Sequence, residues 1–318
     1  MFERIFKLSE HKTTVKTEVM AGITTFMTMA YILAVNPSVL GSTGMDTTAV
    51  LLATALASCL GTLCMAFMAN LPFALSAGMG LNAFMAYTVV AGYGYSWQVA
   101  LLAVFIEGLI FIVLSLTNVR EAIFNAIPLT LKKGVSVGIG LFIAFIGLQN
   151  SGLCVDSATL VGIISFPENF HTAGICALLT LIGLFFTAVF YTRKMKGAIL
   201  YGILLTWILG MLCQVTGLYV PTPDAGFYSL FPSWGMTDFS KLGLTFGQCF
   251  NVDFSAVGIV NFIVVIFSFL FVDIFDTLGT LIGVATKAKM LDKDGKLPGI
   301  KPALLADSIA TSAGAILG

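Results

Sequence analysis

Two aspartates stand inside a long apolar run, in the stretch FVDIFDT at residues 271–277. If the run is a helix, an i, i+3, i+4, i+7 spacing puts four polar side chains on one face: Asp273, Asp276, Thr277 and Thr280. An ionised Asp near mid-membrane costs about 2.5–3.5 kcal/mol on the insertion scale, so such residues usually face the protein interior and have a function. They could accept N–H bonds from a ligand or carry a proton, and the alternative is a structural hydrogen bond to a neighbouring helix.

Two further acids lie in or beside apolar runs. Glu107 stands alone in its run, and a structural contact and a proton relay are equally open for it. Asp307 is close enough to the end of an apolar run that we expect it to be solvated. The two histidines, His11 and His171, fall outside the runs. Any proton transfer within the membrane must therefore use carboxyl groups.

The stretch NLPFALSAGMGLNAFMAYTVV, residues 70–90, is apolar but interrupted. Pro72 and the glycines favour an extended segment over residues 72–78, followed by a half-helix that begins at Gly78 and Met79. Non-helical backbone survives at membrane depth only where protein or a water-filled cavity satisfies its hydrogen bonds. The free N–H groups and the positive dipole end of the half-helix would then face a ligand site.

Asn82 lies on the first turn of this half-helix. Its amide can cap free N–H groups, which is common for Asn near a helix start, or it can point into the cavity. An amide opposite a carboxylate such as that of Asp273 suits a planar ligand that carries both N–H donors and C=O acceptors. A heterocyclic base with an N–H beside a carbonyl is such a ligand.

The elements that must position these residues are membrane-spanning helices. The chain has 318 residues, of which 58% are hydrophobic and 10% charged, far from a soluble domain with about a quarter charged residues. A span needs about 20 mostly apolar residues. On that rule we expect nine spans: 19–40, 48–70, 78–91, 97–117, 133–149, 173–191, 197–218, 257–285 and 302–318.

The basic residues fix the expected orientation. They collect in residues 4–16, 120–133, 193–196 and 287–301, and only Lys241 falls on the other side of the predicted spans. Because cytoplasmic loops collect Lys and Arg, the amino terminus is expected to be cytoplasmic. The net charge is zero at pH 7, which gives no reason to expect a nucleic-acid partner. The six cysteines show no metal-ligand spacing.

Two segments of the chain align as an internal repeat, and a chance match between apolar helices is the alternative. LLATALASCLGTL at 51–63 aligns without gaps with LLADSIATSAGAI at 304–316, an offset of 253 residues. The two segments belong to predicted spans of opposite direction, as in inverted-topology repeats. By the same offset, the second copy of the interrupted segment would begin near position 324. We therefore expect the chain to be a fragment that lacks one wall of its own site.

Four stretches carry a resemblance to a known family: GITTFMTMAYILAVNPSVL, PFALSAGMGLNAF, FVDIFDTLGTLIGVA and PALLADSIATSAGAILG. They resemble the AzgA-type purine permeases, a branch of the nucleobase and ascorbate transporters. The resemblance implies an all-α polytopic membrane protein with a seven-plus-seven inverted repeat and a third span built from a short strand plus a half-helix. This chain would cover about nine spans, with core-domain parts at 1–118 and 255–318 and a gate-domain part at 119–254.

The same resemblance implies the activity and the roles of the site residues. The expected function is uptake of a purine nucleobase across the cell membrane, hypoxanthine or guanine with adenine as a further candidate, by proton symport and alternating access. By the resemblance, Asn82 and Asp273 would bind substrate and Asp276 would couple protons. From the residue pattern alone, we expect Gly78 and Met79 also to bind substrate, and Thr277, Thr280 and Glu107 to couple protons or support the pocket. No cofactor is expected beyond the proton. The expected partners are the purine and the lipid bilayer, and a homodimer is left open.

Two other classes of function compete with this one. An intramembrane enzyme built on Asp273 and Asp276 would need more carboxylates for a Mg²⁺ cage, or a second acidic motif for an aspartyl protease, and the sequence shows neither. An anion transporter of the same fold is disfavoured because the two aspartates would repel an anion. The sequence leaves open which purine is carried, the coupling stoichiometry and the oligomeric state.

Overall fold

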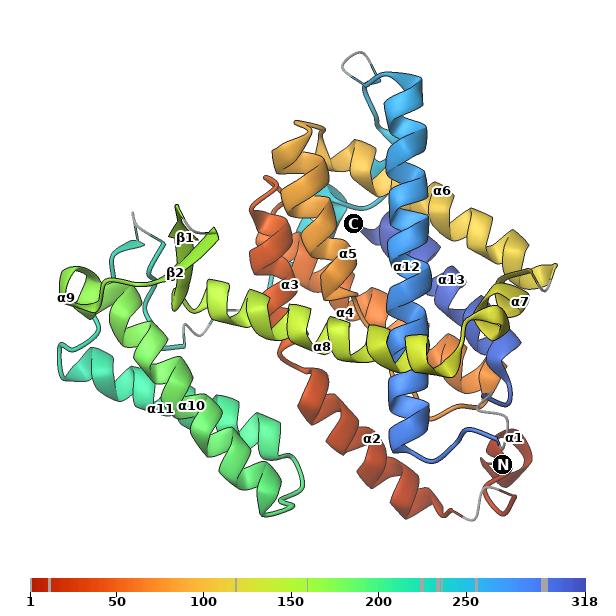
Figure 1. Ribbon diagram of the computed structural model, residues 1–318, viewed down its shortest axis with the longest axis horizontal. Coiled ribbons are helices and arrows are strands. Elements are labelled where there is room, and N and C mark those ends of the chain that lie inside the picture. Colours follow the sequence, from red (N-terminus) through yellow and green to blue (C-terminus); the bar gives the residue numbers. More distant parts are fainter. Residues whose placement is uncertain are drawn as a thin grey trace. The chain divides into compact units, whose positions relative to one another are not determined.

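A computed structural model describes residues 2–10, 13–117, 119–158, 160–223, 226–232, 235, 237–254, 257–292 and 297–318 (Figure 1). Its helices are α1 (Phe2–Phe6), α2 (Val15–Met29), α3 (Ile32–Gly41), α4 (Thr47–Cys64), α5 (Met79–Ala83), α6 (Trp97–Leu116), α7 (Val119–Ala126), α8 (Leu129–Asn150), α9 (Phe166–Asn169), α10 (Ile175–Thr192), α11 (Ala198–Val215), α12 (Ile259–Lys287) and α13 (Ile300–Leu317). The two strands are β1 (Cys154–Ser157) and β2 (Leu160–Ile163). Wider, π-helical turns occupy Met65–Ala69, Phe84–Gly92 and Phe170–Gly174, and short 3₁₀ turns occupy Phe239–Leu244 and Gln248–Phe250.

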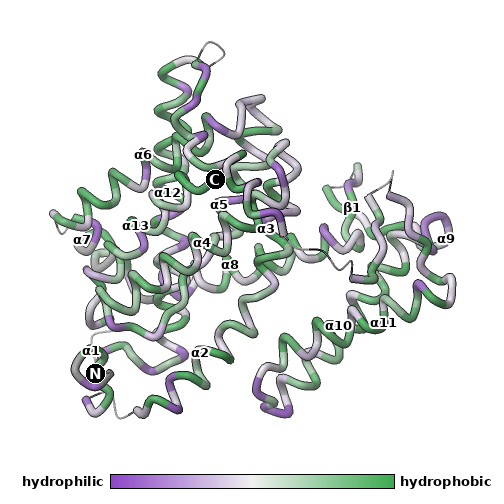
Figure 2. Tube along the Cα trace, turned by 180° about the vertical axis from the view of Figure 1, so that it is seen from behind, coloured by the Kyte–Doolittle hydropathy of each residue, from purple (hydrophilic) through white to green (hydrophobic). Residues whose placement is uncertain are grey.

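The helices have the length and composition of membrane spans. Within the described residues, eight helical segments are long and apolar enough to cross a membrane, and Met79–Gly92 is a shorter apolar helix. These nine segments coincide with the nine predicted spans, so the prediction of a polytopic helical membrane protein is confirmed. Figure 2 shows hydrophobic residues along most of these helices. His11 and part of the basic stretch 287–301 lie outside the described residues.

The chain forms two compact units, which are described separately. The first comprises Met1–Gly22, Ala30–Gly140 and Thr237–Gly318, and the second comprises Ile23–Met29 and Leu141–Met236. In the second unit, α10 and α11 meet through a reciprocal pair: Gly183 faces Thr206 and Gly202 faces Thr187. Each Thr hydroxyl donates to the carbonyl of the glycine four residues earlier in its own helix. The small residues therefore let the helices approach without leaving a hydroxyl unpaired.

The hairpin of β1 and β2 also belongs to the second unit and was not predicted. Its strands are antiparallel and pair Cys154 with Ile163 and Ser157 with Leu160. Each strand has four residues, which is too short for an alternating pattern to stand out in the sequence.

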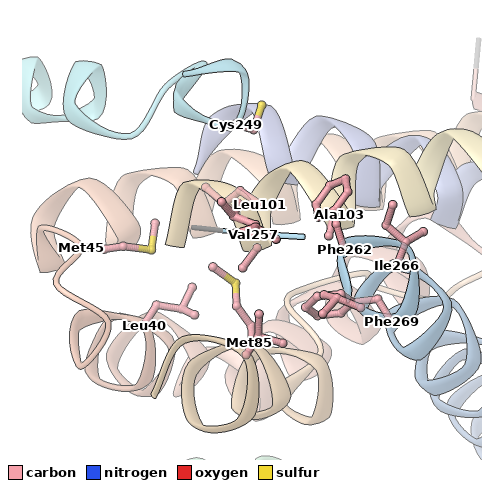
Figure 3. Packing of buried hydrophobic residues seen from close by; sticks show 14 of the residues in the cluster. Leu40, Met45, Met85, Leu101, Ala103, Cys249, Val257, Phe262, Ile266 and Phe269 are labelled. Carbon is pink, nitrogen blue, oxygen red and sulfur yellow. The ribbon is translucent and has the colours of Figure 1, made fainter. Parts of the chain in front are cut away.

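The first unit has a continuous apolar core among α3, α4, α6, α12 and the helix that follows residue 78 (Figure 3). The Phe84 ring meets the Phe269 ring edge to face, with centroids 5.1 Å apart. Phe269 itself is fully buried, as is Val99 of α6. This core joins the first half of α12 to the helix after the interrupted segment. It thereby fixes the position of Asn82, just before Phe84, relative to Asp273, just after Phe269.

Helices α4 and α13, which carry the two copies of the internal repeat, pack against one another. A Cβ atom on Gly61 would lie 2.9 Å from the Cβ of Ala310, and one on Gly314 would lie 3.8 Å from the Cβ of Ala57. At the repeat offset of 253 residues, Ala310 corresponds to Ala57 and Gly314 to Gly61. The contact is therefore reciprocal, as it is between elements related by a two-fold axis.

Candidate functional site

The interrupted segment has the predicted form. Residues 71–78 are not helical, and α5 begins at Met79 after Gly78 in an extended conformation. Asn70, with φ of 52°, turns the chain out of the helical end of α4. Pro72 then disfavours a return to helix. The prediction of an extended segment followed by a half-helix is confirmed.

Side chains of α4 satisfy the backbone of this extended segment. The Thr62 hydroxyl accepts a hydrogen bond from the Leu75 N–H and donates to the Leu75 carbonyl, each at 3.1 Å. One residue further along, the Ser76 and Ser58 hydroxyls lie 2.7 Å apart. The expected short strand has no strand partner among the described residues, because hydroxyl groups of α4 take the place of ladder hydrogen bonds.

A cavity of about 160 Å³ lies beside the segment. Its walls come from α3, α4, the segment itself, α5, the π-helical turn Phe84–Gly92, α6, α12 and α13. Besides the serine pair, its polar lining residues are Asn36, Thr54, Asn82, Glu107, Asp307 and Thr311. Gly78 also lines it. Polar groups that converge on a mostly apolar hollow are the usual form of a small-molecule site.

Asn82 lies in the cavity wall and not in a cap. Its Nδ2 donates to Asn36 Oδ1, and Asn36 Nδ2 donates in turn to Thr54 Oγ1 at 2.7 Å. The start of α5 has no side-chain cap. Of the two readings that the sequence left open, the structure therefore favours the one in which the amide faces the cavity.

Gly78 and Met79, at the start of α5, differ in their contacts. A Cβ on Gly78 would lie 2.8 Å from Asp276 Oδ2, so only a glycine lets the segment approach α12 this closely. Met79 turns its sulfur toward the Tyr31 hydroxyl at 3.8 Å and is not among the cavity-lining residues. Gly78 is thus part of the site geometry, whereas the substrate contact expected for Met79 stays a prediction.

The α12 aspartates have separate environments. Asp273 is buried, and its Oδ2 lies 3.3 Å from a guanidinium nitrogen of Arg120. It does not line the cavity in this structure, so its role as the substrate acid stays a prediction. Asp276 is half-buried and approaches Gly78. The two acids therefore face different neighbours, although they are one helical turn apart.

The two threonines of the predicted face also separate. Thr277 is buried and donates to Asp273 Oδ1 at 3.2 Å or to Asp307 Oδ2 at 3.0 Å. Thr280 is exposed, and its hydroxyl bonds to carbonyls of its own helix. Thr277 therefore lies in the buried stripe of α12 and Thr280 at its edge. The roles expected for both threonines stay predictions.

Arg120 is the residue that the sequence analysis missed. It was counted with the loop charges, yet only 3% of its surface is exposed. Its guanidinium contacts Asp273 and Asp307 at 3.3 and 2.8 Å and donates to the Leu304 carbonyl and Ser308 Oγ at 2.9 and 2.6 Å. The expectation that Asp307 is solvated was wrong, since the ion pair draws it inside.

The position of the short helix α7 explains why Arg120 is buried. Its sequence VREAIFNA is apolar on one side, and it contacts α6 and α13. The Arg120 guanidinium lies 3.9 Å from the centroid of the Phe111 ring in α6, a cation–π geometry. The amphipathic pattern after a long apolar helix was the signal that could have identified Arg120 as a buried cation.

Glu107 is the remaining polar residue of the cavity. It has no exposed surface, and its carboxyl group lies against that of Asp273. Its neighbour Gly108 brings α6 against α13, since a Cβ there would lie 3.0 Å from the Ser312 nitrogen. The close approach of the two helices fixes where the carboxyl group sits.

Comparison with known proteins identifies the family of this chain. Residues 16–318 match the model of the permease family. The guanine/hypoxanthine permeases PbuG and PbuO of Bacillus subtilis are 44% and 42% identical, over 98% and 99% of this chain and 69% of their own length. The adenine permease AdeP of Escherichia coli is 40% identical over 100% of this chain and 66% of its own length. The chain spans about two thirds of the length of these relatives, and it belongs to the permease family, a family of membrane transporters and not of enzymes.

Proposed function

We propose that the protein transports a purine nucleobase and that the cavity beside residues 71–78 binds it. The main observation behind this proposal is that a small cavity lies at the interrupted helix, with Asn82 and Glu107 among its lining residues. Interrupted helices at membrane depth are where transporters bind substrate. Relatives named as guanine/hypoxanthine and adenine permeases support a purine as the cargo.

The charge of the site supports a neutral cargo. The cavity-lining acids are Glu107 and Asp307, and the nearby Arg120 is already engaged by two carboxylates. An anion would therefore meet uncompensated negative charge, which disfavours an anion transporter of the same fold. A neutral base that offers N–H donors and C=O acceptors matches carboxyl and amide groups.

Transport by alternating access between inverted repeats is part of the proposal. The reciprocal contact of Ala57 and Gly61 with Gly314 and Ala310 supports a two-fold relation between α4 and α13. We assign the protein to the plasma membrane. We place the amino terminus in the cytoplasm, because the lysines and arginines of the loops collect on the same side of the predicted spans as the amino terminus.

Proton symport is the proposed coupling, and Asp276 is the proposed proton carrier. His171, in the first turns of the segment Phe166–Thr192, is hydrogen-bonded with the Leu218 carbonyl. Asp276 is a half-buried carboxyl that lies close to Gly78 at the site. The protonation of a carboxyl group in that position can depend on whether residues 71–78 and the ligand are in place.

The proposal is tested by uptake of radiolabelled hypoxanthine into vesicles, with guanine, adenine, xanthine and uracil as competitors. We expect an imposed inward pH gradient to drive uptake, purines to compete and uracil to have little effect. Asp276→Asn should reduce gradient-driven uptake more than purine binding. Competition by uracil alone would refute the cargo, and uptake that ignores the pH gradient would refute the coupling.

A further inference from the structure

We propose that Asn36 and Thr54 allow the Asn82 amide to turn over, so that one site binds both 6-oxo and 6-amino purines. The inference rests on the proposed function, since it takes the cavity as the purine site. Its starting point is a chain of hydrogen bonds among these three side chains, which come from three different helices and all line the cavity.

The hydrogen bonds run from Asn82 into the protein. Asn82 Nδ2 donates to Asn36 Oδ1, and Asn36 Nδ2 donates to Thr54 Oγ1 at 2.7 Å. Asn36 and Thr54 are buried, whereas Asn82 is half-buried. Asn82 is therefore the most accessible member of the chain, and the two buried residues determine how its amide is oriented toward a ligand.

No further contact fixes the direction of these hydrogen bonds. Within the described ranges of the protein, the three side chains form no hydrogen bond except the two that join them. The direction is therefore set by the three groups themselves and by what binds in the cavity.

The chemistry of the three groups makes the direction reversible. An amide carries a donor and an acceptor of nearly the same size, and a hydroxyl group can donate or accept. If both amides turn over, Thr54 donates to Asn36 Oδ1, and Asn36 Nδ2 donates to Asn82 Oδ1. The reversed arrangement keeps two hydrogen bonds and requires no movement of the helices. The number of hydrogen bonds thus favours neither direction.

Each direction presents a different pattern to the ligand. In this structure the Asn82 nitrogen lies toward Asn36, which leaves the Asn82 oxygen and the second N–H for a ligand. In the reversed direction the nitrogen and the oxygen exchange places. The purines differ by the same exchange, since hypoxanthine and guanine carry an N1–H donor beside a C6 carbonyl, whereas adenine carries an N1 acceptor beside a 6-amino group. Asn82 can therefore pair with both classes of base in one pose.

Two matched pairs of bases test the proposal without any mutation. Equilibrium binding to the purified protein is measured for hypoxanthine with adenine and for guanine with 2,6-diaminopurine, since the members of each pair differ only at N1 and C6. We expect the dissociation constants within each pair to agree within about tenfold, because both directions keep the same number of hydrogen bonds. A larger preference within either pair would overturn the proposal.

The variant Asn36→Asp removes the reversibility. An ionised aspartate only accepts hydrogen bonds, so it holds the Asn82 nitrogen toward residue 36. The ratio of 6-oxo to 6-amino affinity should change by about tenfold to a hundredfold, and in the same direction in both pairs. Asn169→Asp, the same change at an exposed position of α9, is the matched control and should leave both ratios as they are. Ratios that stay constant in Asn36→Asp, or that move in opposite directions in the two pairs, would contradict the proposal.

The variant Thr54→Val tests the buried end of the chain. It leaves one polar group of Asn36 without a partner in either direction, so all four bases should bind more weakly, by up to about tenfold, with both ratios kept. Thr54→Ser restores the hydroxyl group and should recover the affinity that is lost. A loss confined to one class of base would show that the direction is fixed.

The remaining outcomes separate this inference from the proposed function. A thermal melt of each variant checks that it is folded. If Asn36→Asp lowers the thermal midpoint and weakens all four bases equally, Asn36 has a structural role, and the inference fails while the proposed function stands. If the original protein binds none of the four bases, the proposed function fails and this inference fails with it.

Discussion

At the scale of single residues, the charge network around Arg120 is the least expected feature of the molecule. One guanidinium serves two carboxylates from different helices, and all three side chains are largely removed from solvent. A buried ion pair adds little net stability when it is complete, but removing one partner strands a charge inside the protein. Because breaking this network is costly, it holds α7, α12 and α13 together.

A substitution at Arg120 tests this network. Arg120→Gln should destabilise the protein by roughly 3–5 kcal/mol, seen as a lower thermal midpoint, because it leaves Asp273 and Asp307 without their cation. Adding Asp273→Asn should recover part of the loss. Arg193→Gln, at the exposed end of α10, is the matched control. If Arg120→Gln has the same thermal midpoint as the original protein, the network contributes no stability.

The sequence singled out the acidic residues but did not identify Arg120 as their partner. Asp273 stood out because a carboxylate in an apolar run is costly, and Asn82 because it follows the interrupted segment. Arg120 did not stand out, since a cation just after a span looks like any other loop charge. Its burial depends on how α7 folds back against α6 and α13, which is a long-range property.

At the scale of elements, the extended segment is held by one helix of its own unit. The Thr62 hydroxyl bridges both backbone groups of Leu75, and the Ser58 hydroxyl meets Ser76. The segment carries Gly78 into the site, so its position depends on α4. The existence of the segment could be predicted from Pro72 and the glycines, but the residues that satisfy it could not, because they lie 13 to 18 positions earlier in the chain.

Thr62→Val removes that bridge while keeping the side-chain shape. It should lower stability by about 1–3 kcal/mol, because the Leu75 N–H and carbonyl lose their partner, and it should weaken purine binding at the same time. Thr180→Val is the matched control, since the Thr180 hydroxyl bonds only to the Cys176 carbonyl of its own helix. Equal behaviour of the two variants in thermal melts and in binding would show that the segment does not depend on Thr62.

At the scale of the whole molecule, composition and hydropathy were sufficient to predict the class of protein and its nine apolar segments. The two segments aligned in the sequence lie in helices that contact one another reciprocally, and the inverted repeat itself stays a prediction. The β1–β2 hairpin and the wider helical turns were not foreseen, because short elements leave no periodic signal. The cavity arises from several elements of the first unit that are far apart in the sequence, and only three-dimensional contact shows that Glu107 belongs to it.

The central claim is that a purine occupies the cavity between Asn82 and Glu107. The most direct measurement is an experimental structure of the protein with guanine bound. We predict density for the base in that cavity, with Asn82 in contact. Density for guanine at another place, or an empty cavity at a guanine concentration that saturates binding, would contradict the account.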